Sequence, residues 1–414
     1  MTTADEPLVV IGADALEQLA AQPPAQPLVV MDTNTREAAG RRVAAMLGDA
    51  AVHVFEQPSD LHAGPEESAQ IGALLTAGVT AVAVGSGVIT DIVRHASHKA
   101  GRDFISVPTA ASMDGYSSSV AAMQVDGIKV TYPARPPRAI YADPGVLGAA
   151  PAELTRAGIG DLLGKATALV DWLAAHLLYG ERYDTDIAAD TQAAMLLAAR
   201  SVEALQAGEQ QAMRDLLDGL IESGLNIARF GDSRPASGLE HHASHFWDLL
   251  ASRGLRQHSS HGLQVGYATG FGMRLQRYAY AGSVAELHTP RPASDPLGAE
   301  ARRWLGEPTT DLVAAIEAKR TLTAHTPEMW PHGKGAWRLV REAIAPAMAC
   351  FPEVELALAH SGIPTAPGYL GIDRETLIAT FHHATRLRER YTTIDLLEGQ
   401  GRLEQAITAA LAAR

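Results

Sequence analysis

The sequence predicts an α/β domain at the N-terminus and an all-α domain at the C-terminus, with the change near residue 150. Before this point, short runs rich in β-branched residues alternate with alanine-rich stretches that suit helices, a pattern typical of βαβ units around a buried parallel sheet. After it, apolar residues recur at helical spacing and alternating strand patterns are almost absent. We therefore expect a Rossmann-like domain over residues 1–150 and a helical domain over residues 151–414.

Individual runs predict the elements. The predicted strands are "LVVIG", "PLVVMD", "AVHVFE", "VTAVAVGSG" and "DFISVPT". The clearest helical segments are "AELTRAGIGDLLGKATALVDWLAAHLLYG", "DTQAAMLLAARSVEALQAG" and "AMRDLLDGLIESGLNIARF". A chain of 414 residues with 47% apolar side chains can bury more than one core.

The composition limits the classes of partner. The 34 basic and 47 acidic side chains leave a formal charge of −13, which argues against a broad surface for nucleic acid or anionic membranes. Cys350 is the only cysteine, so an intrachain disulfide is excluded and a reducing compartment is expected. The first residues lack the pattern of a secretory signal, and no run approaches the roughly 18 to 20 apolar residues that span a bilayer. We expect a cytoplasmic protein without membrane insertion.

A glycine-containing turn follows the fourth predicted strand. Gly85, Ser86 and Gly87 stand between this strand and a helix that carries Asp91. Backbone amides and a helix N-terminus at such a turn can bind a pyrophosphate. The glycine spacing is not the G-x-G-x-x-G of a dinucleotide fingerprint, so a plain tight turn is the alternative.

The next strand also leads into a polar loop. After "FISVP" come Thr109, Ser112, Asp114 and Ser118, at the carboxyl edge of the same sheet, where ligands of open α/β sheets bind. Asp32 ends an earlier strand and could accept hydrogen bonds from an adenosine ribose. A simple helix N-cap is the alternative for this aspartate.

Five of the sixteen histidines fall within residues 240–262. His241 and His245 are four residues apart and so share one face of a helix, whereas His242 points away from that face. His261 begins a second helical run. The spacing therefore allows two imidazoles on separate helices to meet at one metal ion or substrate.

A third ligand would have to come from elsewhere in the chain. Asp161 lies among apolar residues in the first long helical segment, and a buried carboxylate without a partner is costly. An Asp-His-His set would leave open coordination positions, as catalytic zinc sites do. Alternatively, the histidines are hydrogen-bonded individually and Asp161 only caps a helix near Lys165.

Five ordered motifs resemble those of the sn-glycerol-1-phosphate dehydrogenases, particularly their bacterial branch. They are "GSGVITDI", "TAASMDGYSSS", "AGIGDLLGKATALVDW", "SGLEHHASHFWDL" and "HGLQVGY". This family belongs to a superfamily with glycerol dehydrogenase, the iron-containing alcohol dehydrogenases and dehydroquinate synthase. The resemblance implies a nucleotide-binding α/β domain, a helical domain that binds metal and substrate, and an active site in the interdomain cleft.

The resemblance also implies roles for particular residues. The turn and the following loop would contact NAD(P). Asp32 is a further candidate, for the contact with the adenosine ribose described above. The implied cofactor contacts are Gly85, Ser86, Gly87, Val88, Ile89, Asp91, Thr109, Ser112 and Ser118. The implied metal ligands are Asp161, His241 and His261, which would hold one zinc or nickel ion.

The remaining implied roles concern substrate and catalysis. His245 would bind substrate and could relay a proton, Asp114 would lie at the substrate or the nicotinamide, and Asp161 would also line the substrate site. Lys129 and Lys165 are the candidates for a substrate phosphate, because a point charge suits a dianion. A solvent-exposed position is the alternative for either lysine.

The resemblance implies a metal-dependent enzyme that interconverts dihydroxyacetone phosphate and sn-glycerol 1-phosphate by hydride transfer at C2, for phospholipid synthesis. The alternatives are a dehydrogenase for another polyol or phosphorylated ketose, a cyclase of the dehydroquinate synthase kind, and a nucleotide-binding scaffold. We expect a small phosphorylated triose or glycerol as substrate, no nucleic-acid partner, and a homodimer or larger homo-oligomer.

Overall fold

A computed structural model describes residues 6–57, 61–125, 128–281, 298–307, 309–323, 336–364 and 366–413. The chain divides into two compact units. The first comprises residues 1–162 and 200–233, and the second comprises residues 163–199 and 234–414. This division differs from the predicted boundary at residue 150, because it falls later and assigns one helical stretch to the first unit.

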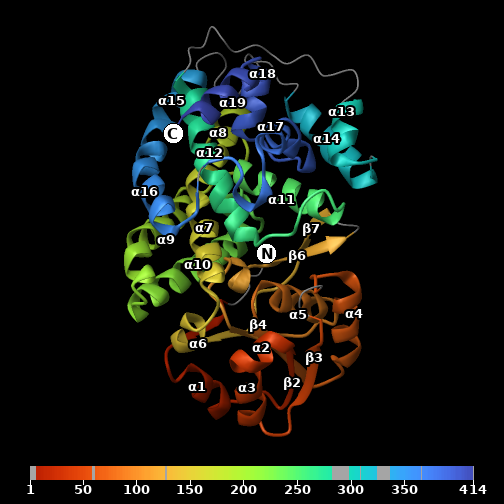
Figure 1. The fold of residues 1–414 in the computed structure, drawn as a ribbon. Coiled ribbons are helices and arrows are strands. Elements are labelled where there is room, and N and C mark those ends of the chain that lie inside the picture. The colour runs from red at the N-terminus through yellow and green to blue at the C-terminus, as the bar shows by residue number, and fades with distance from the viewer. Residues whose placement is uncertain are drawn as a thin grey trace. The chain divides into compact units, whose positions relative to one another are not determined.

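Six parallel strands form one sheet of the first unit (Figure 1). They are β1 (Leu8–Ile11), β2 (Gln26–Asp32), β3 (Ala51–Phe55), β4 (Val79–Gly85), β5 (Phe104–Pro108) and β8 (Ala139–Ala142). Their order across the sheet is β1-β8-β5-β4-β2-β3. The five predicted strands are confirmed, and β8 is an addition, since its run "AIYA" is half alanine and follows a proline-rich stretch.

Both faces of this sheet are covered, which explains the apolar runs. In β2, Val30 packs on the core under α4 (Pro65–Leu74) and α5 (Gly87–Lys99). Its neighbour Val29 packs on the opposite core, which includes α1 (Ala15–Ala21) and α3 (Arg41–Met46). Successive strand residues point to opposite faces, so a strand covered on both sides must be apolar throughout.

The chain reverses its direction across the sheet between β2 and β4. From β2 it continues outward to the edge strand β3, whereas from β4 it runs through α5 to β5 on the other side. β2 and β4 are direct neighbours, with Val30 opposite Ala83. Ligands of open α/β sheets bind outside the carboxyl ends of two such strands. The fold therefore favours these two strand ends as a ligand site.

The first unit contains further elements beside the sheet. They are α2 (Thr33–Thr35), the antiparallel pair β6 (Val120–Val125) and β7 (Ile128–Pro133), α6 (Pro144–Gly148), α7 (Ala152–Leu163) and α10 (Gln210–Phe230). The long predicted helix after Ala150 is thus α7 followed by α8 (Lys165–Tyr179), with Gly164 between them.

Two glycines bring α7 and α10 against the polar loop after β5. A Cβ added to Gly158 of α7 would lie 2.0 Å from the carbonyl oxygen of Ala111. One added to Gly224 of α10 would lie 2.3 Å from both the Asp114 carbonyl oxygen and Ser117 Oγ. Only glycine permits contacts this close, and they explain why residues 200–233 belong to the first unit.

Gly158→Ala should therefore destabilise the protein. The added methyl group must displace backbone, and overpacking of this kind costs about 3 kcal/mol in the free energy of unfolding. Gly72→Ala in α4 is the matched control, since nothing lies within 4 Å of the added Cβ. It should raise stability by roughly 0.5–1 kcal/mol through helix propensity. Thermal and denaturant unfolding measure both variants, and equal stability of the two would contradict the packing described here.

The second unit contains no strand among its described residues. Its further helices are α9 (Thr185–Gln206), which continues into the first unit, α11 (Leu239–Ser252), α12 (His261–Ala281), α13 (Ala299–Leu305), α14 (Thr310–Thr323), α15 (Ala336–Ala347), α16 (Phe351–Ser361), α17 (Arg374–His383), α18 (Thr393–Gly399) and α19 (Leu403–Ala412). Within the ranges given above, every helix is too short or too polar to cross a bilayer.

Candidate active site

Asp32 lies at the carboxyl end of β2, beside the end of β4. Its Oδ1 accepts a hydrogen bond from the Thr35 amide at 2.8 Å, and Thr35 Oγ1 accepts one from the Asp32 amide at 3.0 Å. These two bonds form a capping box for α2. The N-cap alternative for Asp32 is therefore observed, and a contact with ribose stays a prediction.

The turn from Gly85 to Gly87 joins β4 directly to α5, as predicted. Ser86 is the N-cap residue and its side chain makes no capping bond, so amides of the first helical turn have no side-chain cap from this residue. Ile89 is 1% exposed and belongs to the core, with Val88 packed against it. If this segment contacts a cofactor, as predicted, the backbone of the turn is therefore the main candidate for the contact.

Asp91 and Arg94 form a buried ion pair on α5. Arg94 Nη1 lies 2.7 Å from Asp91 Oδ1, and the guanidinium also donates to the carbonyl oxygens of Tyr116 at 3.0 Å and Val120 at 3.1 Å, and to that of Gly115. Burial raises the pKa of Asp91 to about 6, against the opposing charge of Arg94. These contacts do not support the predicted cofactor contact of Asp91. Instead, the Arg94 guanidinium, paired with Asp91, supports the loop after β5 through its bonds to the loop's carbonyl oxygens.

That loop is held by hydrogen bonds of its own. Ser112 Oγ lies 3.3 Å from the Tyr116 hydroxyl, and Ser118 Oγ donates to the Val120 carbonyl oxygen at 3.0 Å. Thr109 is 5% exposed and its amide donates to the Gly85 carbonyl oxygen at 3.2 Å. The structure thus brings the loop and the glycine turn together at the ends of β4 and β5.

Asp114 connects this loop to α7 and α10. Its amide donates to Asp161 Oδ2 at 2.9 Å, and its own Oδ2 accepts a hydrogen bond from Ser223 Oγ at 2.8 Å. Asp161 is 1% exposed. The amide of Asp114 therefore fixes the orientation of the Asp161 carboxylate through one of its oxygens.

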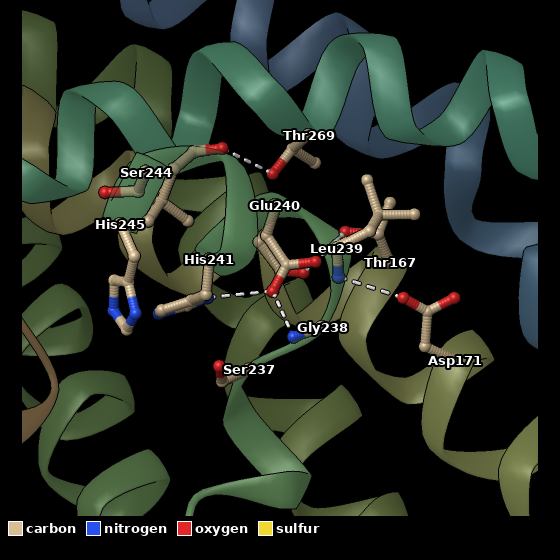
Figure 2. Close-up of polar contacts among 12 residues, drawn as sticks. Thr167, Asp171, Ser237, Gly238, Leu239, Glu240, His241, Ser244, His245 and Thr269 are labelled. Carbon is tan, nitrogen blue, oxygen red and sulfur yellow. Dashed lines mark hydrogen bonds and ion pairs between the residues drawn. The ribbon is translucent and has the colours of Figure 1, made fainter. Parts of the chain in front are cut away.

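In the second unit, buried carboxylates hold the start of α11 (Figure 2). Glu240 Oε1 accepts from the Gly238 amide at 2.6 Å and Asp171 Oδ2 accepts from the Leu239 amide at 2.9 Å. Thr167 Oγ1 donates to Glu240 Oε2 at 2.6 Å. Negative charge beside the first amides of a helix is stabilising. Glu240 is not among the predicted functional residues, although its position directly before His241 offered a signal.

The Glu240 carboxylate also fixes the ring of His241. His241 Nδ1 lies 2.8 Å from Glu240 Oε1 (Figure 2). Burial alone would raise the pKa of Glu240, but the hydrogen bonds from His241, Thr167 and Gly238 outweigh it and hold the pKa below its usual value. An ionised carboxylate only accepts, so Nδ1 carries the proton and Nε2 keeps its lone pair. This arrangement suits a metal-binding imidazole.

His261 has the same tautomer for a different reason. Its Nδ1 lies 2.8 Å from Ser244 Oγ, and Ser244 donates its own proton toward Gln264 Oε1 at 3.4 Å. The Gln264 amide is oriented by donation to Asp248 Oδ1 at 2.9 Å. Ser244 therefore accepts from His261 Nδ1, which leaves the Nε2 lone pair available to a metal.

His245 has the opposite tautomer. Its Nδ1 lies 3.0 Å from Nη2 of Arg388, and a guanidinium can only donate. Nδ1 is therefore the acceptor, and Nε2 carries a proton when the ring is neutral. The ring centroid of His245 lies 6.4 Å from that of His241 and 5.9 Å from that of His261. The three Nδ1 partners thus distinguish two imidazoles suited to a metal from one suited to donating a hydrogen bond.

Asp161, His241 and His261 form a group that could hold a metal ion. Asp161 is on the last turn of α7, a helix that continues past the division between the units to Leu163. Each of the three residues offers one ligand atom, and these atoms all lie within 4.8 Å of one another. Small side-chain adjustments reach the spacing set by metal–ligand bonds of roughly 2.1 Å. One carboxylate oxygen and two imidazole nitrogens suit zinc and nickel alike.

The other candidates have different surroundings. His242 is 1% exposed, and neither ring nitrogen has a hydrogen-bond partner among the described residues. Burial, with the charges of Lys319, Arg390 and Arg388, lowers the pKa of His242 far below its usual value. Lys129 lies on β7, where its charge lowers the pKa of Asp91, and Lys165 is 0% exposed. No contact with a phosphate follows for either lysine from these positions.

The fold has relatives among solved structures. Residues 11–151 match the sequence family described as iron-containing alcohol dehydrogenase. A probable glycerol dehydrogenase from Sinorhizobium meliloti 1021 matches 99% of this chain and 98% of its own, with a TM-score of 0.64 and 17% identity. An iron-containing alcohol dehydrogenase from Thermotoga maritima matches 97% and 98%, with a TM-score of 0.58 and 12% identity. The chain thus has the fold of the iron-containing alcohol dehydrogenases.

Sequence similarity identifies the family within this class. The glycerol-1-phosphate dehydrogenase (NAD(P)+) of Bacillus velezensis is 30% identical over 403 residues, which cover 94% of this chain and 90% of that protein. The enzyme of the same name from Halalkalibacterium halodurans is 38% identical over 249 residues, 58% of this chain. That match spans 62% of the relative, slightly less than two thirds. The chain belongs to the glycerol-1-phosphate dehydrogenase family, which confirms the predicted resemblance.

Proposed function

We propose that the protein is an NAD(P)-linked, metal-dependent dehydrogenase that interconverts dihydroxyacetone phosphate and sn-glycerol 1-phosphate. The group of Asp161, His241 and His261, with both imidazole Nε2 atoms suited to a metal, carries this proposal. The curated relatives bear the name of this activity. We assign the cofactor to the ends of β2, β4 and β5, where Asp32, the glycine turn and the hydroxyl-rich loop lie.

The residues have separate tasks in this reaction. When bound, a divalent ion supplies Lewis acidity toward the ketone and a nicotinamide supplies the hydride. His245 holds a proton at Nε2 and can donate it to the oxygen on C2 of the substrate. Asp114 orients the Asp161 carboxylate through its amide, and Ser223 orients the carboxylate of Asp114 itself, which we assign to the substrate.

A cofactor-oxidation assay tests the proposal. Metal-free protein receives zinc or nickel, then NADH or NADPH, with dihydroxyacetone phosphate or dihydroxyacetone as substrate. We expect metal-dependent loss of nicotinamide absorbance with the phosphorylated ketone and far slower loss with the free ketone. Equal or faster consumption of the free ketone would favour a polyol dehydrogenase. A lack of net consumption with either ketone would favour the cyclase or the scaffold.

The metal ion, the assembly and the location of the protein are further parts of this proposal. We propose zinc or nickel as the ion, because the ligand set contains nitrogen and a carboxylate oxygen. We also propose a homodimer or larger assembly and a cytoplasmic location, both on the basis of the resemblance described above. The resemblance gives the cofactor as NAD(P). Metal analysis of purified protein and light scattering measure the ion and the assembly.

A further inference from the structure

Arg388 lies in the segment between the short helical turn Ala384–Leu387 and α18. It comes from a part of the chain far from the histidine-rich residues 240–262, and none of the predicted roles falls on it. The residue is partly buried, and its Nη2 lies 3.0 Å from His245 Nδ1. The guanidinium is therefore adjacent to the imidazole that we assign to the substrate.

The charges around Arg388 favour an anion. Burial and the nearby charge of Arg390 lower the pKa of Arg388 to about 10, and the exposed Glu389 opposes them. The side chain remains a cation at neutral pH. The charge of Lys319 also acts on α11, at His242, but Lys319 is paired with Asp395 at 3.1 Å. The bond to His245 does not itself neutralise the guanidinium, because Nδ1 of the imidazole is an uncharged acceptor.

The chemistry of the substrate matches this placement. Only a methylene group and an ester oxygen separate C2 of dihydroxyacetone phosphate from phosphorus. A substrate with its C2 oxygen beside His245 and the ligand histidines therefore keeps its phosphate within reach of a side chain adjacent to His245. Guanidinium groups bind phosphate oxygens through paired, charge-assisted hydrogen bonds, which ammonium groups cannot reproduce.

We propose that Arg388 binds the phosphate of the triose substrate and determines the preference for phosphorylated over free ketones. This inference rests on the proposed function and deepens it. It replaces Lys129 and Lys165 as the first candidate for phosphate recognition. Arg388 has a second, positioning role, because its donation to Nδ1 keeps the Nε2 proton of His245 directed to the substrate.

The test compares Arg388→Gln with the wild type in the metal-loaded protein. The ratio of kcat/KM for dihydroxyacetone phosphate to that for dihydroxyacetone should fall about a hundredfold, as expected for lost bonds between two charged groups. Activity with dihydroxyacetone should fall only severalfold, since a free imidazole populates both tautomers. Arg388→Lys should lose about tenfold in the same ratio, because charge remains without the planar fork.

Arg386→Gln is the matched control. Arg386 lies in the same segment, but its guanidinium contacts His383 Nδ1 rather than His245. This variant should keep the wild-type ratio. If Arg388→Gln loses kcat/KM equally with both ketones, so that the ratio between them is unchanged, the inference is overturned. A raised KM for NADH or NADPH with an unchanged ratio would also overturn it, by assigning the guanidinium to a cofactor phosphate.

Two further measurements keep the outcomes distinct. If Arg388→Gln fails to fold, as judged by circular dichroism, the Arg388→Lys ratio decides the question. If the wild type does not reduce dihydroxyacetone phosphate, the proposed function fails. In that case, calorimetric titration of inorganic phosphate still tests the phosphate site. Weaker binding in Arg388→Gln than in Arg386→Gln would support it, and equal binding would overturn it.

Discussion

His241→Ala is expected to lose its bound metal and nearly all activity. The substitution removes an imidazole whose Nε2 lone pair is fixed toward the metal site by Glu240, and alanine has no group that can replace it. Loss of Lewis acidity at the reacting oxygen should lower kcat/KM for dihydroxyacetone phosphate by about a thousandfold or more. Elemental analysis of the dialysed protein and the cofactor-oxidation assay measure the two effects.

His242→Leu is the control for that variant. His242 is on the same helix and is buried, but its ring nitrogens have no hydrogen-bond partner among the described residues. Leucine has a similar size and removes an unpaired polar group from the interior, so stability should be preserved or increased. Metal content and activity should stay close to those of the wild type. Equal metal loss in the two variants would show that the ligand histidine was chosen wrongly.

Glu240→Gln is expected to weaken metal binding about 10- to 100-fold without removing a ligand. The new amide can donate to His241 Nδ1, which would move the ring proton to Nε2 and block coordination. Competition with a chelator measures the dissociation constant, and the visible spectrum of cobalt-substituted protein reports the ligand geometry independently of activity.

Thr167→Val separates this effect from a general loss of packing. The variant removes the 2.6 Å bond to Glu240 Oε2 but leaves the Oε1 contact with His241. It should cost roughly 1 kcal/mol of stability and change metal affinity less than Glu240→Gln does. An unchanged dissociation constant in Glu240→Gln would contradict the assigned role of the carboxylate.

The fold could be predicted largely because its signals are local. The central strands β2, β4 and β5 are largely buried, so their sequences are nearly continuous apolar runs. β8 is buried as well, but four residues after a proline-rich stretch carry too little pattern. The periodicity of residues 210–230 identified a helix without indicating the core on which it packs. Its membership of the first unit depends on Gly224, whose role appears only when the Asp114 loop is beside it.

The candidate site was predictable to a similar extent. Asp161, His241 and His261 were identified from residue type, spacing and family motifs, and they come together in the structure. Asp91 matched the family motif as well, but its carboxylate is paired with Arg94, three residues later on the same helix, a spacing already visible in the sequence. Arg388 begins the segment "RERYTTIDLL", which also resembles the family, but the sequence does not show that its neighbour is His245.

The anchoring of α11 by Asp171 has a consequence for biosynthesis. The same carboxylate that accepts from the Leu239 amide also accepts from the amide of Thr393 at 2.9 Å and from its hydroxyl at 2.6 Å. A growing polypeptide therefore carries every proposed ligand long before the ribosome has made Thr393, the last of these partners of Asp171. Stable loading with metal should accordingly await synthesis of Thr393, and a chain truncated shortly before it should purify with less metal.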